Sequence, residues 1–302
     1  MVSARPCDPT GYKTYQSPEL FEPDWRTFYV ESIGWTKEFA ATVNSSMGLL
    51  YGDDPFQTLD VFAPADATDA PVLLYFHGGG FKEGHPSHYG YLGKRLVERG
   101  AIFVSVGYRF EPEFAYPHYV DDGAQALKWV VDNIADFGGD PSRIFATGHS
   151  AGANIVSLLT LRNDWVDRLA LARDTIKGIA LLSGGYDADV KDPAYPDAKA
   201  RSVESNVVSR VETAPETVIV VFGSPERQRL GQSNDFFKNH ALSLLKVLAD
   251  QGVSADVLEL PDTDHLRTSI ELGDADSPVA AAVERMVLGD STRPLDTSRP
   301  TA

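Results

Sequence analysis

Short runs of apolar residues recur along the chain and alternate with stretches in which apolar positions follow a helical period. Val72–Phe76 and Val218–Phe222 are continuous apolar runs, as expected for strands buried on both faces. The same reasoning predicts further strands at Leu59–Phe62, Ile102–Val106, Ile144–Thr147, Ile179–Leu182 and Ala255–Leu260. Spacings of three and four predict helices around Tyr91–Arg99, Leu127–Ile134, Ile155–Leu159, Phe237–Leu248 and Val279–Val287.

Strands and helices therefore alternate over most of the chain, which predicts an α/β fold with a mostly parallel central sheet and helices on both faces. Residues 1–50 precede this pattern, with a short helix expected at Thr36–Ser45, and are interpreted as a small N-terminal cap. Residues 51–289 then form the main domain, in which 184–214 is a loop insertion rich in Asp, Ala and Pro. The polar tail 290–302 is predicted to be disordered.

Composition narrows the class of protein. The 302 residues carry a formal net charge of −16, a field that repels phosphate backbones and anionic lipids, so neither nucleic-acid nor membrane binding is expected. Cys7 is the only cysteine, which excludes an intramolecular disulfide and a multi-cysteine metal site. No apolar run approaches the ~20 residues of a membrane span, and residues 1–13 lack the apolar stretch of a signal peptide. The expected location is cytoplasmic.

The first chemical motif is Gly148-His149-Ser150-Ala151-Gly152, which matches G-x-S-x-G. It follows the predicted strand Ile144–Thr147 and opens an amphipathic helix, the setting that a nucleophile elbow requires. In this setting Ser150 is the candidate nucleophile, and the N–H of Ala151 points toward an oxyanion formed there. The alternative is a glycine-rich helix start in which Ser150 only caps the helix.

A second glycine-rich segment, His77-Gly78-Gly79-Gly80-Phe81, follows the strand Val72–Phe76. Glycines after a buried strand allow backbone N–H groups to approach a ligand closely, so Gly79 and Gly80 are candidates for an oxyanion hole. The alternative is a flexible turn. Phe81 and His149, the neighbours of these groups, are predicted to border the substrate pocket.

With both motifs in place, the chain resembles the α/β-hydrolase fold, and within it the hormone-sensitive-lipase-like branch of carboxylesterases. His77–Phe81 matches the HGGGF of that branch and Gly148–Gly152 its elbow. The segment from Tyr108-Arg109 to Asp121 is a variant of the Y-R-x-x-P-E…P…D motif. Gln57–Phe62 resembles the corresponding segment of kynurenine-formamidase-like small esterases. The resemblance covers roughly residues 48–288 and implies a serine hydrolase with a Ser, Asp or Glu, His triad in that order.

Seven histidines are candidates for the catalytic base. His265 is favoured because it follows the last predicted strand, where this fold delivers its base to the sheet edge. The pair His85 and His88 lies in a loop before the elbow and lacks the helix and HExxH pattern of a metal site, so no metal is expected.

The acid should follow the strand Val218–Phe222. Glu226 is the first carboxylate in the loop Gly223–Arg227 and is the favoured candidate, although relatives more often have an aspartate near this point. Asp235, Asp262 and Asp264 stay open as alternatives, the last two because they are close to His265 in sequence.

These residues predict a carboxylic-ester hydrolase that acts through an acyl-enzyme on Ser150, without a metal or organic cofactor. An arylformamidase or other small amidase is the alternative reaction, and a catalytically dead hydrolase fold serving as a scaffold is a third reading. The expected partner is a small-molecule ester, and a homodimer is one option for the oligomeric state. Aromatic residues of the N-terminal segment either line an apolar pocket or cover the sheet: Tyr12, Tyr15, Phe21, Trp25, Phe28 and Trp35.

Overall fold

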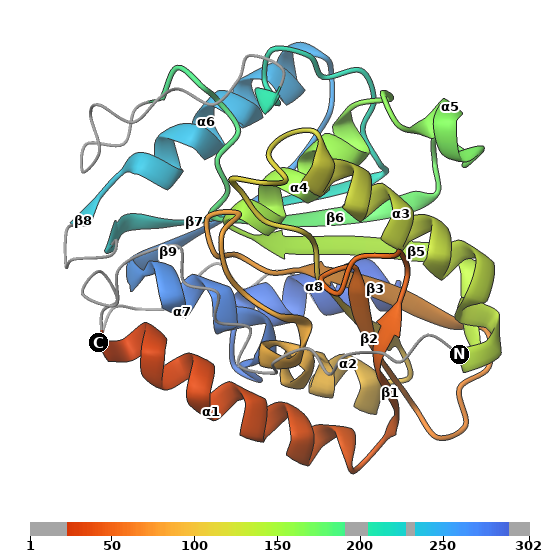
Figure 1. Cartoon of the computed structure of the whole chain (residues 1–302). Coiled ribbons are helices and arrows are strands. Elements are labelled where there is room, and N and C mark those ends of the chain that lie inside the picture. Colours follow the sequence, from red (N-terminus) through yellow and green to blue (C-terminus); the bar gives the residue numbers. More distant parts are fainter. Residues whose placement is uncertain (1–22, 191–204, 228–232, 290–302) are drawn as a thin grey trace.

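The computed structural model describes residues 23–190, 205–227 and 233–289 (Figure 1). The predicted tail and residues 191–204 of the 184–214 connection lie outside these ranges, as do Tyr12, Tyr15 and Phe21. Within them the strands are β1 (Asn44–Leu50), β2 (Thr58–Ala63), β3 (Ala70–Phe76), β4 (Ile102–Val106), β5 (Gly139–His149), β6 (Ile176–Leu182), β7 (Thr217–Arg227), β8 (Ser233–Asn234) and β9 (Asp256–Asp264). The helices are α1 (Pro23–Ala40), α2 (Lys94–Glu98), α3 (His118–Asn133), α4 (Ala151–Leu161), α5 (Val166–Leu169), α6 (Phe236–Asp250), α7 (His265–Ile270) and α8 (Pro278–Leu288).

The strands of the described residues form one sheet in the order β1-β2-β4-β3-β5-β6-β7, with β9 paired to the far side of β7 and the short β8 at its end. Pairing is antiparallel for β1–β2 and β2–β4, and parallel for every pair from β4 across to β9. The predicted mostly parallel α/β sheet is thus confirmed. Its central strands are buried along their whole length because helices cover both faces.

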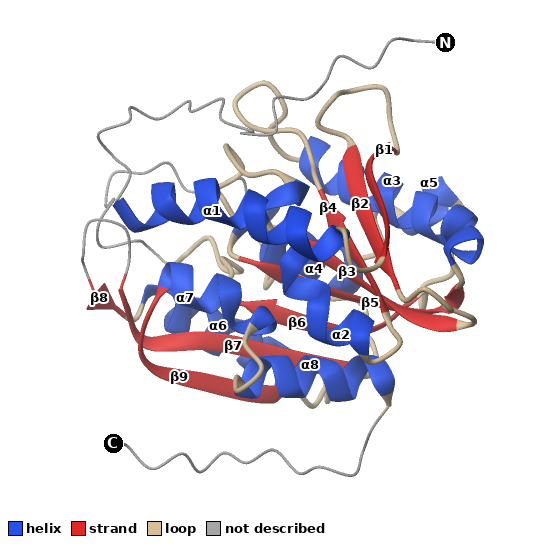
Figure 2. Cartoon of the chain, turned by 90° about the horizontal axis from the view of Figure 1, so that it is seen from below, coloured by secondary structure: helices blue, strands red, loops and turns tan. Residues whose placement is uncertain are grey.

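Two apolar clusters lie on opposite faces of the sheet. On one face α3, α4 and α6 pack on the strands, and on the other α1, α2 and α8 do so. Figure 1 shows the first group above the sheet, and Figure 2, seen from below, shows α1, α2 and α8 in front of it. Since all parallel strands run in the same direction, the residues that follow their carboxyl ends gather at one edge.

The N-terminal segment differs from the sequence prediction. The expected helix at Thr36–Ser45 is instead α1, which begins at Pro23 and ends at Ala40, and Ser45 lies in strand β1. The buried stripe of α1 contains two hydroxyl side chains between aromatic ones, so the apolar period is interrupted: Phe28, Ser32, Thr36 and Phe39. The hydroxyls are satisfied by the segment below: Ser32 Oγ lies 3.3 Å from His88 Nδ1, and Thr36 Oγ1 accepts the N–H of Tyr91.

The N-terminal aromatic residues that the structure describes cover the sheet. Phe28 is buried and its ring contacts those of Tyr29, Trp35 and Tyr89. Trp35 is 40% exposed. Phe28 therefore acts as core, which matches the second of the two interpretations given above.

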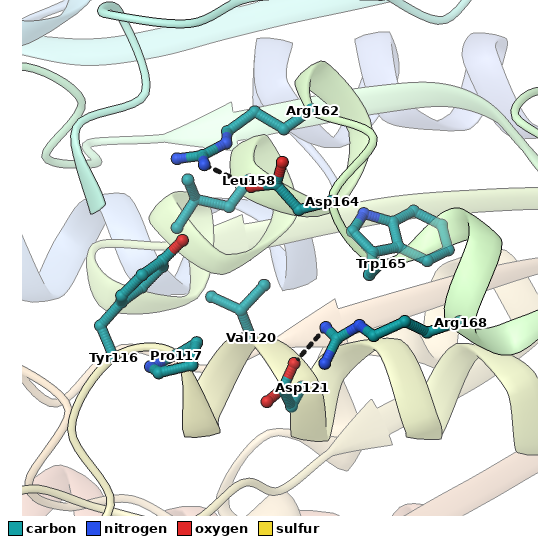
Figure 3. A pocket seen from close by; sticks show the side chains of 9 residues that line it. All are labelled: Tyr116, Pro117, Val120, Asp121, Leu158, Arg162, Asp164, Trp165 and Arg168. Carbon is teal, nitrogen blue, oxygen red and sulfur yellow. Dashed lines mark hydrogen bonds and ion pairs between the residues drawn. The ribbon is translucent and has the colours of Figure 1, made fainter. Parts of the chain in front are cut away.

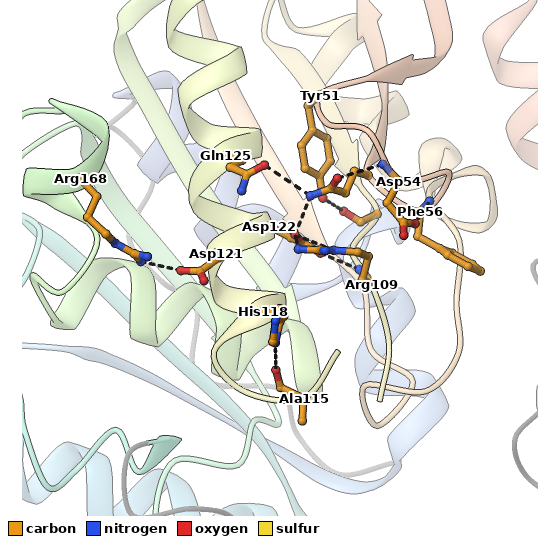
Figure 4. Close-up of polar contacts among 12 residues, drawn as sticks. Tyr51, Asp54, Phe56, Arg109, Ala115, His118, Asp121, Asp122, Gln125 and Arg168 are labelled. Carbon is orange, nitrogen blue, oxygen red and sulfur yellow. Dashed lines mark hydrogen bonds and ion pairs between the residues drawn. The ribbon is translucent and has the colours of Figure 1, made fainter. Parts of the chain in front are cut away.

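A buried ion pair fixes the chain that follows β4 (Figure 4). Asp122 of α3 is fully buried and accepts hydrogen bonds from Arg109 Nη2 at 2.6 Å, the Arg109 backbone N–H at 2.9 Å and Gln57 Nε2 at 2.7 Å. Tyr51 donates its hydroxyl proton to the carbonyl of Gly107 in the same turn. Because Tyr51 and Asp122 both bond to this turn, Tyr108 has a fixed position between them in the chain.

Candidate active site

The nucleophile elbow forms where β5 meets α4. Ser150 adopts φ 54° and ψ −115°, an unfavourable conformation for a residue with a side chain. Gly152 permits the sharp turn, because a Cβ there would lie 1.9 Å from the carbonyl oxygen of Phe76. The Ser150 side chain makes no capping hydrogen bond to α4. The capping-serine alternative therefore lacks its defining contact, and Ser150 stands at a strained apex.

The glycine-rich segment after β3 packs directly against this apex. A Cβ on Gly78 would lie 3.2 Å from Ser150 Cβ. Gly79, Gly80 and Phe81 have φ values of 118°, 62° and 64°, so the backbone curls over the elbow in the left-handed region. Phe81 is buried and its ring lies 4.3 Å from that of Tyr119. The segment thus lies against the turn that holds Ser150, while Phe81 contacts α3.

A buried histidine and a tyrosine anchor the segment. The His77 ring lies between Tyr89 and Tyr108, nearly parallel to both, at centroid distances of 5.6 and 4.5 Å. Its Nδ1 donates to the carbonyl of Gly78 at 2.7 Å, and the Tyr108 hydroxyl donates to the carbonyl of His77 at 2.7 Å. Burial lowers the pKa of His77 to about 3, so the ring is neutral. Sequence reasoning missed this role of Tyr108, because only the tertiary structure brings β4 beside β3.

The candidate base and acid meet at the ends of two paired strands. β7 and β9 continue beyond the predicted strand ends, with Glu226 opposite Thr263 and Arg227 opposite Asp264. His265 is the next residue and begins α7. Its Nδ1 lies 2.5 Å from Oε1 of Glu226, which is fully buried. The expected loop at 223–227 is thus strand, because it pairs with residues 260–264, which extend β9 beyond its predicted end.

Two rings flank His265. Phe237 of α6 stacks on one side, with centroids 4.3 Å apart and planes within 2°. His149 contacts it from the elbow at 4.4 Å. His149 immediately precedes Ser150, so this contact brings the candidate base to the turn of the candidate nucleophile. The apolar spacing predicts Phe237 only as part of a helix, since nothing in its sequence context marks it as a neighbour of the candidate base.

His149 itself is held neutral. The Thr268 hydroxyl donates to the carbonyl of His265, so it can only accept from His149, whose Nε2 lies 3.1 Å away. Burial, and next the nearby His265, lower the pKa of His149 well below its usual value. His149 is 1% exposed and packs on protein atoms, so its predicted place at the substrate pocket stays a prediction.

The other candidate residues lie elsewhere or have other partners. Asp264 accepts the N–H of Arg267 at 2.7 Å and so caps α7, while Asp235 is exposed at the start of α6. The side chain of Asp262 is not among those described. His85 and His88 each contact a serine, Ser87 and Ser32. Among the described residues there is no group of three or more His, Cys, Asp or Glu that could hold a metal ion.

A small cavity of about 60 Å³ opens away from the elbow, between the start of α3, the end of α4 and α5 (Figure 3). Arg162 pairs with Asp164, and Arg168 pairs with Asp121, so the charges in its wall cancel. The length of α4, about 16 Å, separates its far end from Ser150. This cavity is therefore not the place where a scissile bond would meet the serine.

The fold and this site define the class of protein as an α/β hydrolase. A family model described as alpha/beta hydrolase fold matches residues 73–268, well over half of the chain. The chain belongs to that family, in its hormone-sensitive-lipase-like group. No helix of the described residues is long and apolar enough to cross a membrane.

Several curated proteins are similar in sequence. A probable isoprenylcysteine alpha-carbonyl methylesterase of Oryza sativa subsp. japonica is 38% identical over 145 residues, which are 46% of this chain and 34% of that protein. Carboxylesterase NlhH of Mycobacterium tuberculosis is 44% identical over 97 residues, 32% of this chain and 30% of that protein. Kynurenine formamidase of Danio rerio is 25% identical over 286 residues, 90% of this chain and 92% of that protein. The matches to the plant methylesterases span 34–47% of their length.

Solved structures share the fold at low identity. A truncated carbohydrate esterase from gut microbiota has a TM-score of 0.68 and 16% identity, with 83% of this chain and 97% of that chain covered. Esterase LipW from Mycobacterium marinum has a TM-score of 0.66 and 20% identity, with coverages of 89% and 93%. At these identities the likeness extends to the fold alone.

Proposed function

We propose that the chain is a serine hydrolase that cleaves a carboxylic ester of small to medium size through an acyl-enzyme on Ser150. The observation that carries the proposal is the 2.5 Å contact between His265 Nδ1 and Glu226 Oε1, formed beside the ring of His149 and thus beside the elbow. A histidine oriented by a buried carboxylate next to a strained serine is the arrangement that activates a weak nucleophile.

In this mechanism Ser150 Oγ attacks the ester carbonyl, and Nε2 of His265 takes the serine proton and then returns it to the leaving alcohol. Glu226 fixes the tautomer with the proton on Nδ1 and stabilises the imidazolium. The N–H groups of Gly79, Gly80 and Ala151 stabilise the tetrahedral oxyanion. Water, activated by His265, then attacks the acyl-enzyme and releases the acid.

A formamide is the second candidate substrate. The kynurenine formamidase of Danio rerio aligns along nearly the whole of both chains, whereas the methylesterases and NlhH align over shorter parts. The same residues could attack a formyl carbonyl, with an amine in place of the alcohol as the leaving group. The HGGGF segment favours the ester, because formamidases commonly have an aromatic pair in place of its last glycine and phenylalanine.

Turnover of p-nitrophenyl acetate and of N-formylkynurenine, measured side by side, separates the two candidates. A fluorophosphonate probe should label Ser150, and Ser150→Ala should fold and lose nearly all turnover on both substrates, by a factor on the order of 10⁴ or more. Ser157→Ala, which removes another buried hydroxyl of α4, is the control and should be labelled like the wild type. Labelling of a different serine, or wild-type turnover by Ser150→Ala, would refute the proposal.

A further inference from the structure

Both oxygens of the Glu226 carboxylate are engaged. Oε1 accepts from His265, and Oε2 accepts from the Ser183 hydroxyl at 2.8 Å and from the Gly223 N–H at 2.9 Å. Glu226 is fully buried and Ser183 is 1% exposed. Ser183 directly follows β6, the strand paired with β7 that holds Glu226, and lies 43 residues away in sequence. It has no place in the mechanism described so far.

The backbone of Ser183 is strained. Ser183 follows β6 directly and has φ 45°, in the left-handed region that favours glycine. Its N–H donates to the carbonyl of Val221 at 2.8 Å, which fixes it against β7. A glycine would satisfy this backbone with less strain, so the side chain is the feature that serine adds here. Strain of this kind is concentrated at functional sites.

The Ser183 hydroxyl supplies a hydrogen-bond donor that the buried Glu226 carboxylate requires. Burial disfavours the ionised form of a carboxyl group, and donors directed at its oxygens favour that form. Glu226 must be ionised to orient His265 and must present Oε1 to it. A donor fixed on Oε2 meets both requirements, since it stabilises the negative charge and prevents rotation of the carboxylate.

The other ionisable groups near this carboxylate do not replace Ser183. Tyr186 is held neutral, because burial and next the charge of Glu226 raise its pKa well above the usual value. Its hydroxyl contacts the N–H of Gly184. His149 is neutral and contacts the ring of His265. Asp264 accepts the N–H of Arg267. Ser183 supplies the side-chain donor on Oε2.

We propose that Ser183 is a positioning residue for the triad: its hydroxyl holds the buried Glu226 carboxylate turned toward His265. The inference rests on the proposed function, because it gives Ser183 a role only if Ser150, His265 and Glu226 act together. It predicts that the hydroxyl, and not the fit of the backbone, sets the activity.

Ser183→Ala and Ser183→Gly separate these two effects. Both lose the hydroxyl, but only glycine also relieves the strain, so Ser183→Gly is expected to fold even if Ser183→Ala does not. We expect both to lower kcat for p-nitrophenyl acetate by about 10-fold to 100-fold, as for a lost hydrogen bond to a charged group, with KM changed less than about twofold.

Ser157→Ala, which replaces a buried serine that bonds only within α4, is the control and should keep the wild-type kcat and KM. Wild-type kcat in Ser183→Gly would overturn the inference, since loss of the hydroxyl would then have left the activity unchanged. Ser150→Ala, run in the same assay, distinguishes the two failures. If Ser150→Ala is inactive while Ser183→Gly is normal, only the role of Ser183 is wrong; if Ser150→Ala is active, the proposed function itself fails.

Discussion

Glu226 Oε1 lies 2.5 Å from His265 Nδ1, although the two residues are 39 positions apart in the chain. The contact follows from the pairing of β7 with β9, in which Glu226 stands opposite Thr263, two residues before His265. The proposed acid and base are thus positioned by the same backbone ladder, at the carboxyl edge that also holds Ser150. A chain break or register shift in either strand would separate them.

The first prediction concerns the identity of the triad acid. Glu226→Gln should keep the fold and lose kcat by a factor on the order of 10³ to 10⁴, because the amide cannot hold the productive histidine tautomer. Glu226→Asp should lose less if the strand end can follow the shorter side chain. Steady-state kinetics with one p-nitrophenyl ester measures both.

Amide variants of the alternative carboxylates complete this test. Asp235→Asn and Asp262→Asn should stay near the wild-type rate. Asp264→Asn should keep most activity and lose about 1 kcal/mol of stability at most, because Asp264 caps α7. A loss below about tenfold for Glu226→Gln, with a large loss for any of these three, would move the acid to that residue.

The second prediction concerns the buried histidines. The pKa values of His77 and His149 lie below that of an unfolded histidine, so the unfolded chain takes up protons that the folded chain does not. The contribution of these two histidines to the free energy of unfolding is fully present above about pH 6.5. It is lost as the pH falls below this value, by about 1.4 kcal/mol per pH unit for each group. Denaturant titrations at pH 7, 6 and 5 should show a smaller decrease in His149→Phe than in the wild type. An identical decrease in both would show that His149 is not a buried neutral group.

A third prediction concerns Asp60, which has a buried carboxylate with one hydrogen bond. Its Oδ1 accepts the Gly48 N–H at 2.7 Å, while Oδ2 has no hydrogen-bond partner among the described residues. Burial raises the pKa of Asp60 to about 6. The folded chain therefore loses stability as pH rises from about 4 to about 6, by about 3 kcal/mol at most.

Asp60→Asn should remove this loss, so the variant gains about 1–3 kcal/mol over the wild type at pH 7 and nothing below pH 4. Urea denaturation at both pH values measures the difference. Asp66→Asn, at an exposed position of the same region, is the matched control and should change little. Equal stability of Asp60→Asn and wild type at pH 7 would refute the assignment.

A fourth prediction concerns the Arg109–Asp122 pair. Asp122→Asn should lower the free energy of unfolding by about 3 kcal/mol, because it leaves a partly buried guanidinium without its carboxylate. The turn that carries Tyr108 would loosen, so kcat should also fall. Thermal denaturation and kinetics check both effects, and Asp132→Asn, whose partner Lys128 lies on the exposed surface of the same helix, should show neither. If Asp122→Asn is as stable as the wild type but has a lower kcat, the loss of activity does not come from a loosened turn at Tyr108.

Local chemistry made the fold and the motifs predictable. Continuous apolar runs such as Val72–Phe76 can bury all of their side chains only inside a sheet covered on both faces. The glycines around Ser150 are the residues that a strained turn requires. The N-terminal helix was misplaced because its buried face depends on contacts that are distant in sequence. Ser32 and Thr36 occupy buried positions in α1, and nothing in the sequence shows that their hydroxyls bond to residues 88 and 91.

The sequence by itself determined the alternation of strand and helix, the elbow at Ser150 and the glycine segment after β3, because each depends on residues that are near one another in the chain. The tertiary structure alone decided which carboxylate contacts His265, where the rings of His149 and Phe237 lie, and that Ser183 contacts Glu226. These contacts join residues tens of positions apart, and they depend on strand order and register. Both are set by the packing of the whole sheet, which no single segment specifies.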